Sequence, residues 1–574
     1  MRRRKPSQNP WTSDFRSIVA IASILTIAAA ALPAAAAPIE VVIDGTQRLR
    51  VADASVAGGM VTLKLLQAPG VPLVAPVERV RCVSGPCPQG LIAQAADRPP
   101  AQSFEIQGSN TIGERLMPAL VEQYLKKTFH VDAEETPLSD PVEKQVSFDG
   151  GNGPVDIVIR AHGTATGFEP PVGVKKPPTA QIWMASRRIH DDERAQARTK
   201  QGLDLTAPES EHVIALDGLA IVVNEQNPIS ALSISEIAQI FAGKITHWQD
   251  VKSAQDPTGR PTFVGDIKVY RRDNNSGTTA TFNDLVFGPY VKVDPSLKSC
   301  YDVRDSDAGA CFAPSAAKYE SSESLESDVA NDKYGVGFIG IGYRQNTKAL
   351  GIIRSCAPDA SGPARTFAYS PSVFNIKTEE YPLARRLYLY TLGEPANALA
   401  RGVVNFASSQ DADAAIRREG FIDQAIGFAD YGAQGERFAS MAGVAARDDA
   451  LTQSFIADVR FATRLSTTLR FADKEDTLDN KAKADLVTLA NALKSDKYQG
   501  RHFLIIGFSD AGDDLQASVD LSKRRASVVA KALQDAGVPV YQDNARAFGS
   551  AAPVACNDTE EGRALNRRVE IWVK

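Results

Sequence analysis

The stretch from residue 101 to residue 426 alternates between short apolar runs and amphipathic segments, and this alternation limits the folds open to the chain. Residues 103–106 predict a strand, and the Leu-Ala-Ile-Val-Val run at 219–223 predicts a buried one. A helix is predicted to follow Ser233, because Glu236 stands three residues later, as in a capping box. Strands that alternate with helices indicate an α/β domain.

Composition and pattern divide the rest of the chain. Residues 37–100 contain short β-like runs between Gly and Pro turns, which predicts a small β-rich module. Residues 427–455 are rich in Ala and Gly without sustained periodicity, which predicts a linker. Residues 456–574 predict a second mixed unit in β-α-β-α-β order. A chain of 574 residues has room for about three such units.

The first 36 residues have the pattern of a secretory signal peptide: a basic start, an apolar run at 18–32, and then Pro and Ala residues. The alternative is a membrane anchor, but the run is short for the ~20 residues that a spanning helix needs. Cleavage of this segment removes five basic residues and one acidic residue, so the formal net charge of the chain changes from −5 to −9. Such a chain argues against a nucleic-acid partner, which requires a basic face.

Export permits disulfides among the six cysteines. Four of them flank short loops, and the expected pairs are Cys82 with Cys87 and Cys300 with Cys311. Cys356 and Cys556 lie in different predicted domains and are expected to be free. Neither the cysteines nor the six histidines have the spacing of metal ligands, so we predict no metal site and no cofactor.

Three loops rich in glycine and hydroxyl residues, at 108–113, 162–167 and 272–278, stand where a strand is expected to meet a helix. Helix N-termini expose unpaired N–H groups with partial positive charge, and glycine lets the backbone approach a ligand closely. Arg272 lies four residues before Ser276, so both can reach one oxyanion. A single such loop is usually a turn or an N-cap. Three of them with an arginine predict an anion site.

These three loops, in this order, resemble those of the periplasmic phosphate-binding proteins, the PstS-like family. Segments 232–248, 335–340 and 381–388 are also similar to segments of that family. The resemblance covers about 101–426 and implies a type II periplasmic binding fold, with phosphate held between two α/β lobes. The residues on which it implies phosphate contacts are Thr111, Ile112, Thr164, Arg272, Ser276, Gly277 and Thr278.

One position departs from this family. Where members have an Asp that accepts a hydrogen bond from protonated phosphate, the alignment places Arg187. An arginine cannot accept a hydrogen bond. The preference for phosphate over sulfate or another oxyanion is therefore left open. Arg187 is expected either to be a second cationic donor or to point to solvent.

Segments 507–512, 521–529 and 566–571 resemble the OmpA-like peptidoglycan-binding domain. Asp510 and Arg525 fall on the two anchor positions of that family. The resemblance implies that they hold the zwitterionic diaminopimelate end of a peptidoglycan stem peptide, with carboxylate to ammonium and guanidinium to carboxylate. From the residues alone, the alternative is a surface salt bridge, which contributes about 0–1 kcal/mol.

The predicted architecture is α/β: a small N-terminal β module, a two-lobed periplasmic-binding-protein domain, and an α+β OmpA-like domain. It implies an exported substrate-binding protein that captures phosphate for uptake and is tethered to peptidoglycan in the periplasm. An ABC permease partner and association with the outer membrane are further expectations. The alternative is a wall-anchored scaffold or sensor that does not serve transport. A phosphatase would need a metal cluster, a Ser-His-Asp set or a Cys-His set, and none of these is found in the sequence.

Overall fold

The structure is a computed structural model. The residues that it describes are 39–43, 47–66, 68–84, 88, 102–140, 142–150, 153–167, 180–202, 204–274, 276–303, 307–356, 365–444, 450–471, 476–498, 500–510 and 514–574. They belong to two compact units, which divide between Ile92 and Ala93. The predicted signal peptide lies outside the described residues. None of the helices among the described residues is long and apolar enough to cross a membrane.

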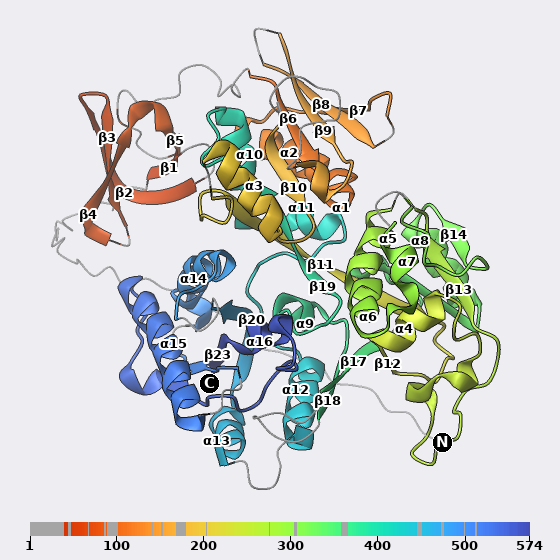
Figure 1. The fold of residues 1–574 in the computed structure, drawn as a ribbon. Coiled ribbons are helices and arrows are strands. Elements are labelled where there is room, and N and C mark those ends of the chain that lie inside the picture. Colours follow the sequence, from red (N-terminus) through yellow and green to blue (C-terminus); the bar gives the residue numbers. More distant parts are fainter. Residues whose placement is uncertain are drawn as a thin grey trace, which may run out of the picture. The chain divides into compact units, whose positions relative to one another are not determined.

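The first unit is an antiparallel sheet with the strand order β4-β3-β2-β1-β5 (Figure 1). Its strands are β1 (Ile39–Ile43), β2 (Gln47–Ala57), β3 (Met60–Leu65), β4 (Ala68–Pro76) and β5 (Val80–Ser84). Val41, Val51, Val61 and Leu63 are fully buried and form its core. Val51, Val61 and Leu63 alternate with exposed or half-buried neighbours, as expected for strands with one face packed on a core.

The second unit contains an eleven-stranded mixed sheet among the described residues, with the order β14-β13-β15-β11-β19-β10-β6-β9-β8-β7 and β16 beside β11. A smaller sheet has the order β12-β17-β18. The strands are β6 (Phe104–Gly108), β7 (Glu134–Pro137), β8 (Glu143–Asp149), β9 (Pro154–Arg160), β10 (Ala180–Ala185), β11 (Glu211–Val223), β12 (Ala231–Ser233), β13 (Lys268–Arg272), β14 (Ala317–Tyr319), β15 (Gly335–Gly340), β16 (Lys348–Ala349), β17 (Gly351–Cys356), β18 (Arg365–Tyr369) and β19 (Ala384–Tyr390).

Helices cover these sheets (Figure 1). They are α1 (Asn110–Gly113), α2 (Leu116–Phe129), α3 (Asp191–Gln201), α4 (Ile234–Phe241), α5 (Gly277–Phe282), α6 (Gly288–Val293), α7 (Lys298–Tyr301), α8 (Ser322–Asn331), α9 (Val373–Lys377), α10 (Ala398–Ala407) and α11 (Asp413–Arg418). Helix α4 begins with the predicted capping box, in which the Ser233 side chain accepts from the Glu236 amide and the Glu236 side chain bonds back to residue 233.

Strand β11 passes through both halves of the large sheet. Its first part pairs with β19, from Glu211 opposite Tyr390 to Gly218 opposite Ala384. Its second part pairs with β15, beginning with Leu219 opposite Gly340. The chain therefore forms two lobes: lobe 1, residues 102–218 and 384–423, and lobe 2, residues 219–383. This confirms the predicted α/β fold class.

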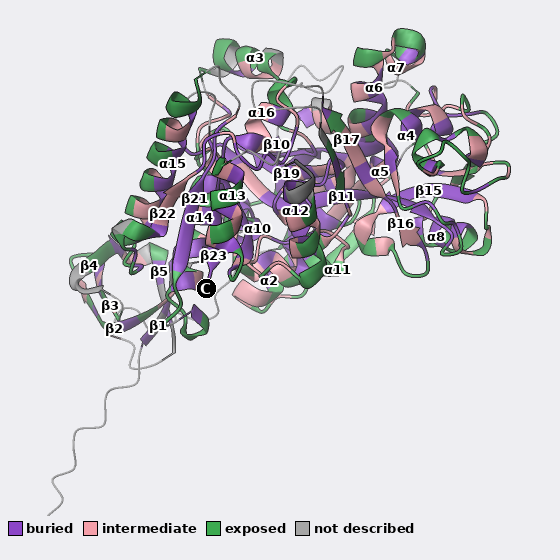
Figure 2. Cartoon of the chain, turned by 90° about the horizontal axis from the view of Figure 1, so that it is seen from below, coloured by how far each residue is buried: buried purple, intermediate pink, exposed green. Residues whose placement is uncertain are grey.

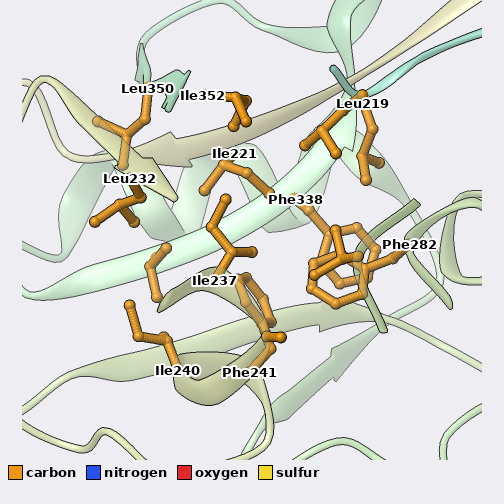
Figure 3. Close-up of a cluster of buried hydrophobic side chains, with 14 of the residues drawn as sticks. Leu219, Ile221, Leu232, Ile237, Ile240, Phe241, Phe282, Phe338, Leu350 and Ile352 are labelled. Atoms are coloured by element: carbon orange, nitrogen blue, oxygen red, sulfur yellow. The ribbon is translucent and has the colours of Figure 1, made fainter. Parts of the chain in front are cut away.

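Each lobe has its own apolar core. In lobe 2, Phe241, Phe282 and Phe338 pack together, with ring centroids 4.5–5.4 Å apart, beside the buried side chains of β11 (Figure 3). In lobe 1, the apolar face of α2 packs on β6, β9 and β10. Figure 2 shows the central strands buried, whereas α3 turns mostly exposed residues outward. The cores fix the lobes as separate bodies joined by β11 and β19.

The C-terminal domain, residues 427–574, has a sheet with the order β20-β23-β21-β22. Its elements are α12 (Tyr431–Val444), α13 (Ala450–Val459), β20 (Thr463–Arg470), α14 (Asn480–Leu493), β21 (Phe503–Gly507), α15 (Leu515–Asp535), β22 (Ala545–Ala547), α16 (Glu560–Asn566) and β23 (Arg568–Val573). Helix α15 shows an exposed outer face in Figure 2. Leu465, Leu489, Ile505, Val529 and Ile571 are fully buried in its main core.

Two sequence-based expectations differ from the structure. The segment predicted to be a linker, 427–455, contains α12 and the first part of α13. Arg437 of α12 is buried and donates to the Ala552 carbonyl at 2.8 Å, so contacts distant in sequence hold this helix. Its Ala- and Gly-rich composition gave no such signal.

The prediction that Cys356 and Cys556 are free is wrong, because they form a disulfide with an S–S distance of 2.03 Å. Their predicted domains pack together, which the chain separation of 200 residues did not reveal. The predicted Cys300–Cys311 disulfide is confirmed. Cys82 is disulfide-bonded, and its predicted partner, Cys87, lies outside the described residues.

Candidate functional site

A cavity of about 130 Å³ lies where α1 of lobe 1 meets α5 of lobe 2. The first predicted loop leads from β6 into α1, and the third leads from β13 into α5. Polar residues from both lobes line the cavity, and they include Thr111, Asp217, Arg272, Thr278, Ser321 and Ser322. Two of the three loops predicted from the sequence are thus brought to one place, together with strand β11.

The α5 end of the cavity is built around the Ser276 N-cap. The Ser276 hydroxyl accepts from the Thr278 amide at 3.1 Å. A Cβ on Gly277 would lie 2.4 Å from the Thr111 hydroxyl oxygen and 2.7 Å from the Thr111 amide nitrogen. Only glycine therefore allows α5 to come this close to α1. Glycine is therefore required at position 277 because Thr111 of lobe 1 lies directly against it.

Arg272 is held at the cavity wall and is only 8% exposed. Its Nη1 donates to the Ser322 hydroxyl at 2.8 Å, and its Nη2 donates to the Glu320 carbonyl at 2.6 Å. Its Nε is buried and has no hydrogen-bond partner among the described residues. These hydrogen bonds fix the guanidinium, while its Nε–H group has no acceptor among the described residues.

A second arginine reaches the first loop. Arg385 of β19 donates from Nη2 to the Thr111 hydroxyl at 2.8 Å and from Nε to Asp217 Oδ2 at 3.2 Å. It is 9% exposed, and its Nη1 has no partner among the described residues. No local pattern in the sequence predicted this ion pair as part of the site. The available signal was Asp217 itself, a lone carboxylate within the apolar run of β11.

No residue of the second loop is among those that line this cavity, although the Gly163 amide donates to the Gly108 carbonyl of the first loop at 2.9 Å. The Thr164 hydroxyl accepts from the Ser186 amide at 3.2 Å and lies 3.3 Å from the Ser186 hydroxyl. The Ile112 side chain is fully buried in the lobe 1 core. A phosphate contact by Ile112 would therefore have to come from its backbone amide. Arg187 forms a two-pronged ion pair with Glu193, at 2.8 and 2.7 Å. Its charge is therefore used within lobe 1.

The two lobes also touch at the mouth of the cavity. Arg115 of lobe 1 donates to the Tyr343 hydroxyl of lobe 2 at 2.5 Å. It also pairs with Glu419 of lobe 1 at 3.3 Å. Together with the contact between Thr111 and Gly277, this places the lobes in a closed arrangement.

The second predicted site lies in the C-terminal domain. Asp510 follows β21 and accepts from Arg567 at 3.4 Å, and Arg567 also pairs with Glu560 at 2.5 Å. Arg525 is fully buried, donates to the Phe508 carbonyl at 3.3 Å, and lies 5.3 Å from the centroid of the Phe471 ring.

Burial lowers the pKa of Arg525 to about 10, and the charge of Asp510 opposes that shift. The charges of Asp510 and Arg567 both act on Arg525, and Arg567 is also hydrogen-bonded to Asp510. Segments 472–475 and 511–513, which flank this site, lie outside the described residues.

Among the residues that the structure describes, no group of three or more His, Cys, Asp or Glu side chains is placed to hold a metal ion. The residues that line the cavity supply hydrogen-bond donors, arginine charge and carboxylate acceptors. Such a set binds and orients a small polar ion.

Comparison with known proteins assigns both domains. Residues 143–411 match the model of the PBP superfamily domain, and residues 470–567 match that of the OmpA family. Protein SphX of Synechococcus elongatus is 28% identical over 296 residues, which cover 50% of this chain and 74% of that protein. The phosphate-binding protein PstS of Bacillus subtilis is 24% identical over 266 residues, which cover 46% of this chain and 70% of that protein.

Among solved structures, an ABC-type phosphate transport receptor from Vibrio cholerae is similar at 22% identity, with a TM-score of 0.37, and the match covers 56% of this chain and 99% of that one. The chain therefore carries a PBP superfamily domain, similar to PstS phosphate-binding proteins, followed by an OmpA family domain.

Proposed function

We propose that this chain is an exported binding protein that captures phosphate, or a closely related oxyanion, in the cavity between α1 and α5. The observation that carries the proposal is the convergence of Arg272, Thr111 and the Ser276–Thr278 turn on one cavity of about 130 Å³. A small cavity with donors on several sides suits a compact tetrahedral anion. The names of the relatives that match the first domain agree with this ligand.

Unused donors support an anion as the ligand. Arg272 Nε and Arg385 Nη1 are both buried without a partner among the described residues. An unpaired buried donor destabilises a protein by about 1–3 kcal/mol, and by more when it is charged. An oxyanion that accepts from such groups removes that penalty, and the bonds it forms are charge-assisted. Thr111, Ser276, Gly277 and Thr278 add hydroxyl and amide donors in the proposal, with Ile112 and Thr164 as outer contributors.

Asp217 is our candidate for the selectivity group. It lines the cavity and accepts from Arg385, and an ionised carboxylate can only accept hydrogen bonds. A hydrogen phosphate ion can donate its proton to such a group. A sulfate ion carries no proton near neutral pH and would meet the carboxylate as a like charge. Asp217 thereby supplies the acceptor that Arg187 cannot.

The C-terminal domain is proposed to hold peptidoglycan, through Asp510 and Arg525 and with Arg567 as a further contact. The protein then works in the periplasm as a wall-associated receptor for phosphate uptake, and an ABC permease is its proposed partner. Association with the outer membrane belongs to the same proposal. The role is one of binding without catalysis.

Calorimetric titration of the full mature chain, freed of bound anion in mild urea, tests the proposal with phosphate and then with sulfate. Arg272→Ala is expected to weaken phosphate binding by a factor of about 100 or more, because charge-assisted hydrogen bonds are lost. Arg260→Ala is the matched control, since Arg260 is exposed in the same lobe and should leave binding unchanged. If the folded chain gives no heat with either anion, the uptake role fails and a wall-anchored scaffold becomes the better explanation.

A further inference from the structure

The C-terminal domain contacts both lobes of the PBP domain, and residues far apart in sequence hold it on lobe 2. On lobe 2 the link is covalent, through the disulfide between Cys356 of β17 and Cys556. The Tyr369 hydroxyl of β18 also donates to the Val554 carbonyl at 3.0 Å, and both groups are buried. Figure 1 shows β20 beside α9 and α12 beside β18.

Buried ion pairs strengthen this attachment to lobe 2. Arg464 of β20 pairs with Glu380 at 2.6 Å, and the two side chains are 1% and 2% exposed. Arg470 donates from Nε to Glu379 at 2.8 Å and from Nη2 to the Thr378 carbonyl at 2.6 Å. Breaking a buried pair leaves an uncompensated charge, which is strongly unfavourable. Lobe 2 and the C-terminal domain are therefore expected to move as one body.

Lobe 1 leads directly into the C-terminal domain through residues 424–426, and side-chain hydrogen bonds from α14 add to this link. The Asn480 amide, at the start of α14, donates to the Thr206 carbonyl and to Glu211 Oε2, both at 2.8 Å. Next to it, Asp479 accepts from Arg386 Nη1 of β19 at 2.9 Å. We call these three hydrogen bonds the clasp contact. They join the start of α14 to the beginning of β11 and to β19, on the lobe 1 side of the point where these two strands pass between the lobes.

Because the C-terminal domain contacts both lobes, it affects how the cavity can open. Binding proteins of two lobes admit ligands by a hinge motion that separates the lobes. Here the disulfide holds the C-terminal domain on lobe 2. Lobe 1 can then swing away from lobe 2 only if it also leaves α14, so the clasp contact has to break.

We propose that the C-terminal domain is a clasp that holds the two lobes closed, and that the clasp contact sets the rate at which the bound anion is released. The release rate rests on the proposed function, because it needs an anion in the cavity. The restraint on the lobes does not rest on it and can be measured without any ligand.

The test uses the full mature chain with Asn480→Ala. Asn491→Ala is the matched control, because Asn491 lies on the exposed side of the same helix. A second variant, Asp479→Asn, removes the charge that Arg386 meets, while its carboxamide can still cap α14. Thermal unfolding of each variant establishes that it is folded.

Hydrogen exchange followed by mass spectrometry, without added anion, reports on the lobes. We expect amides of 110–113 and 277–282 to exchange about tenfold faster in Asn480→Ala and Asp479→Asn, because hydrogen bonds of ordinary strength are lost. Asn491→Ala should match the parent chain. Equal protection at these amides in all four proteins would overturn the clasp.

Stopped-flow displacement then measures release of inorganic phosphate. A rate about tenfold higher in the two clasp variants, with the control unchanged, is the expected result. If exchange at the lobe contact speeds up while no phosphate binds to the parent chain, the clasp stands and the assigned anion is wrong. If phosphate binds and its release rate does not change in folded clasp variants, the gating role is overturned.

Discussion

Arg385 and Arg386 are neighbours in β19, yet they donate to opposite sides of the strand. Arg385 bonds Thr111 and Asp217 at the cavity, whereas Arg386 bonds Glu379 of lobe 2 and Asp479 of the C-terminal domain. Successive side chains of a strand point to opposite faces, so one dipeptide serves both contacts. A shift of β19 that changes the Arg385 contacts at the cavity would therefore also change the Arg386 contacts with Glu379 and Asp479.

The Asp217 carboxylate is expected to separate phosphate from sulfate. In Asp217→Asn, the carboxamide can donate to sulfate, and the like-charge repulsion disappears. We expect sulfate affinity to rise by about tenfold and phosphate affinity to fall by about tenfold, the effect of one charged hydrogen bond in each case. Titration calorimetry with each anion measures the ratio.

Asp266→Asn is the control for this ratio, because the Asp266 side chain is 85% exposed. An unchanged ratio in Asp217→Asn would remove Asp217 from the selectivity mechanism.

The disulfide between Cys356 and Cys556 is expected to be the more stabilising of the two described pairs. It closes a separation of 200 residues, against 11 for Cys300–Cys311. In the chain-entropy description, replacing both cysteines by serine loses about 5 kcal/mol for the long loop and about 3 kcal/mol for the short one. Urea unfolding of the two double variants tests the order. A larger loss for the short loop would show that native-state contacts outweigh the constraint on the unfolded chain.

Acid sensitivity is expected from His212, whose burial at the start of β11 lowers its pKa to about 4 from 6.5. Above pH 6.5 the imidazole is neutral in both states, and stability is unaffected. As the pH falls from 6.5 toward 4, only the unfolded chain takes up the proton, so the free energy of unfolding decreases. Between pH 7 and pH 5 the loss is about 2 kcal/mol.

Urea unfolding at the two pH values, with His212→Gln for comparison, measures this loss. Asp413 acts with the opposite sign, since burial and the charge of Asp423 raise its pKa to about 6 from 3.8. Stability from Asp413 is present at low pH and is lost as the pH rises through 6. The comparison between parent and variant cancels that contribution. An equal pH dependence in both would refute the assignment to His212.

The C-terminal site is tested with Asp510→Asn, which keeps the shape of the side chain and removes the charge offered to an ammonium group. We expect cosedimentation with isolated peptidoglycan to weaken by about tenfold or more, as for the loss of a charge-assisted hydrogen bond. Asp535→Asn, at the exposed end of α15, should bind as the parent does. Equal binding by both variants would mean that the domain holds the wall by other residues.

Local signals were enough to predict much of the fold. The capping box of Ser233 and Glu236 and the apolar run of β11 each depend on neighbours in sequence, and both appear in the structure as expected. Helix α12 could not be predicted in this way. It contains Gly432, Gly435 and Gly443, and its buried Arg437 finds partners more than a hundred residues away.

In the candidate site, too, residues that are close in sequence could be predicted and residues that are far apart could not. Arg272, Gly277 and Thr278 lie in one loop, so their spacing revealed them. Asp217 and Arg385 meet across two strands that are 168 residues apart, and only the pairing of β11 with β19 brings them together. The Cys356–Cys556 bond depends on the packing of whole domains, which no local pattern encodes.

That bond also changes what proteolysis can do to this protein. A protease that cuts the chain once between Cys356 and Cys556 produces two pieces that are still joined through sulfur. The two lobes would then stay attached to the C-terminal domain, and the cut would appear as two bands only on a reducing gel. If the C-terminal domain holds the wall as proposed, release of the two lobes requires reduction as well as cleavage, or a cut beyond the bridged segment.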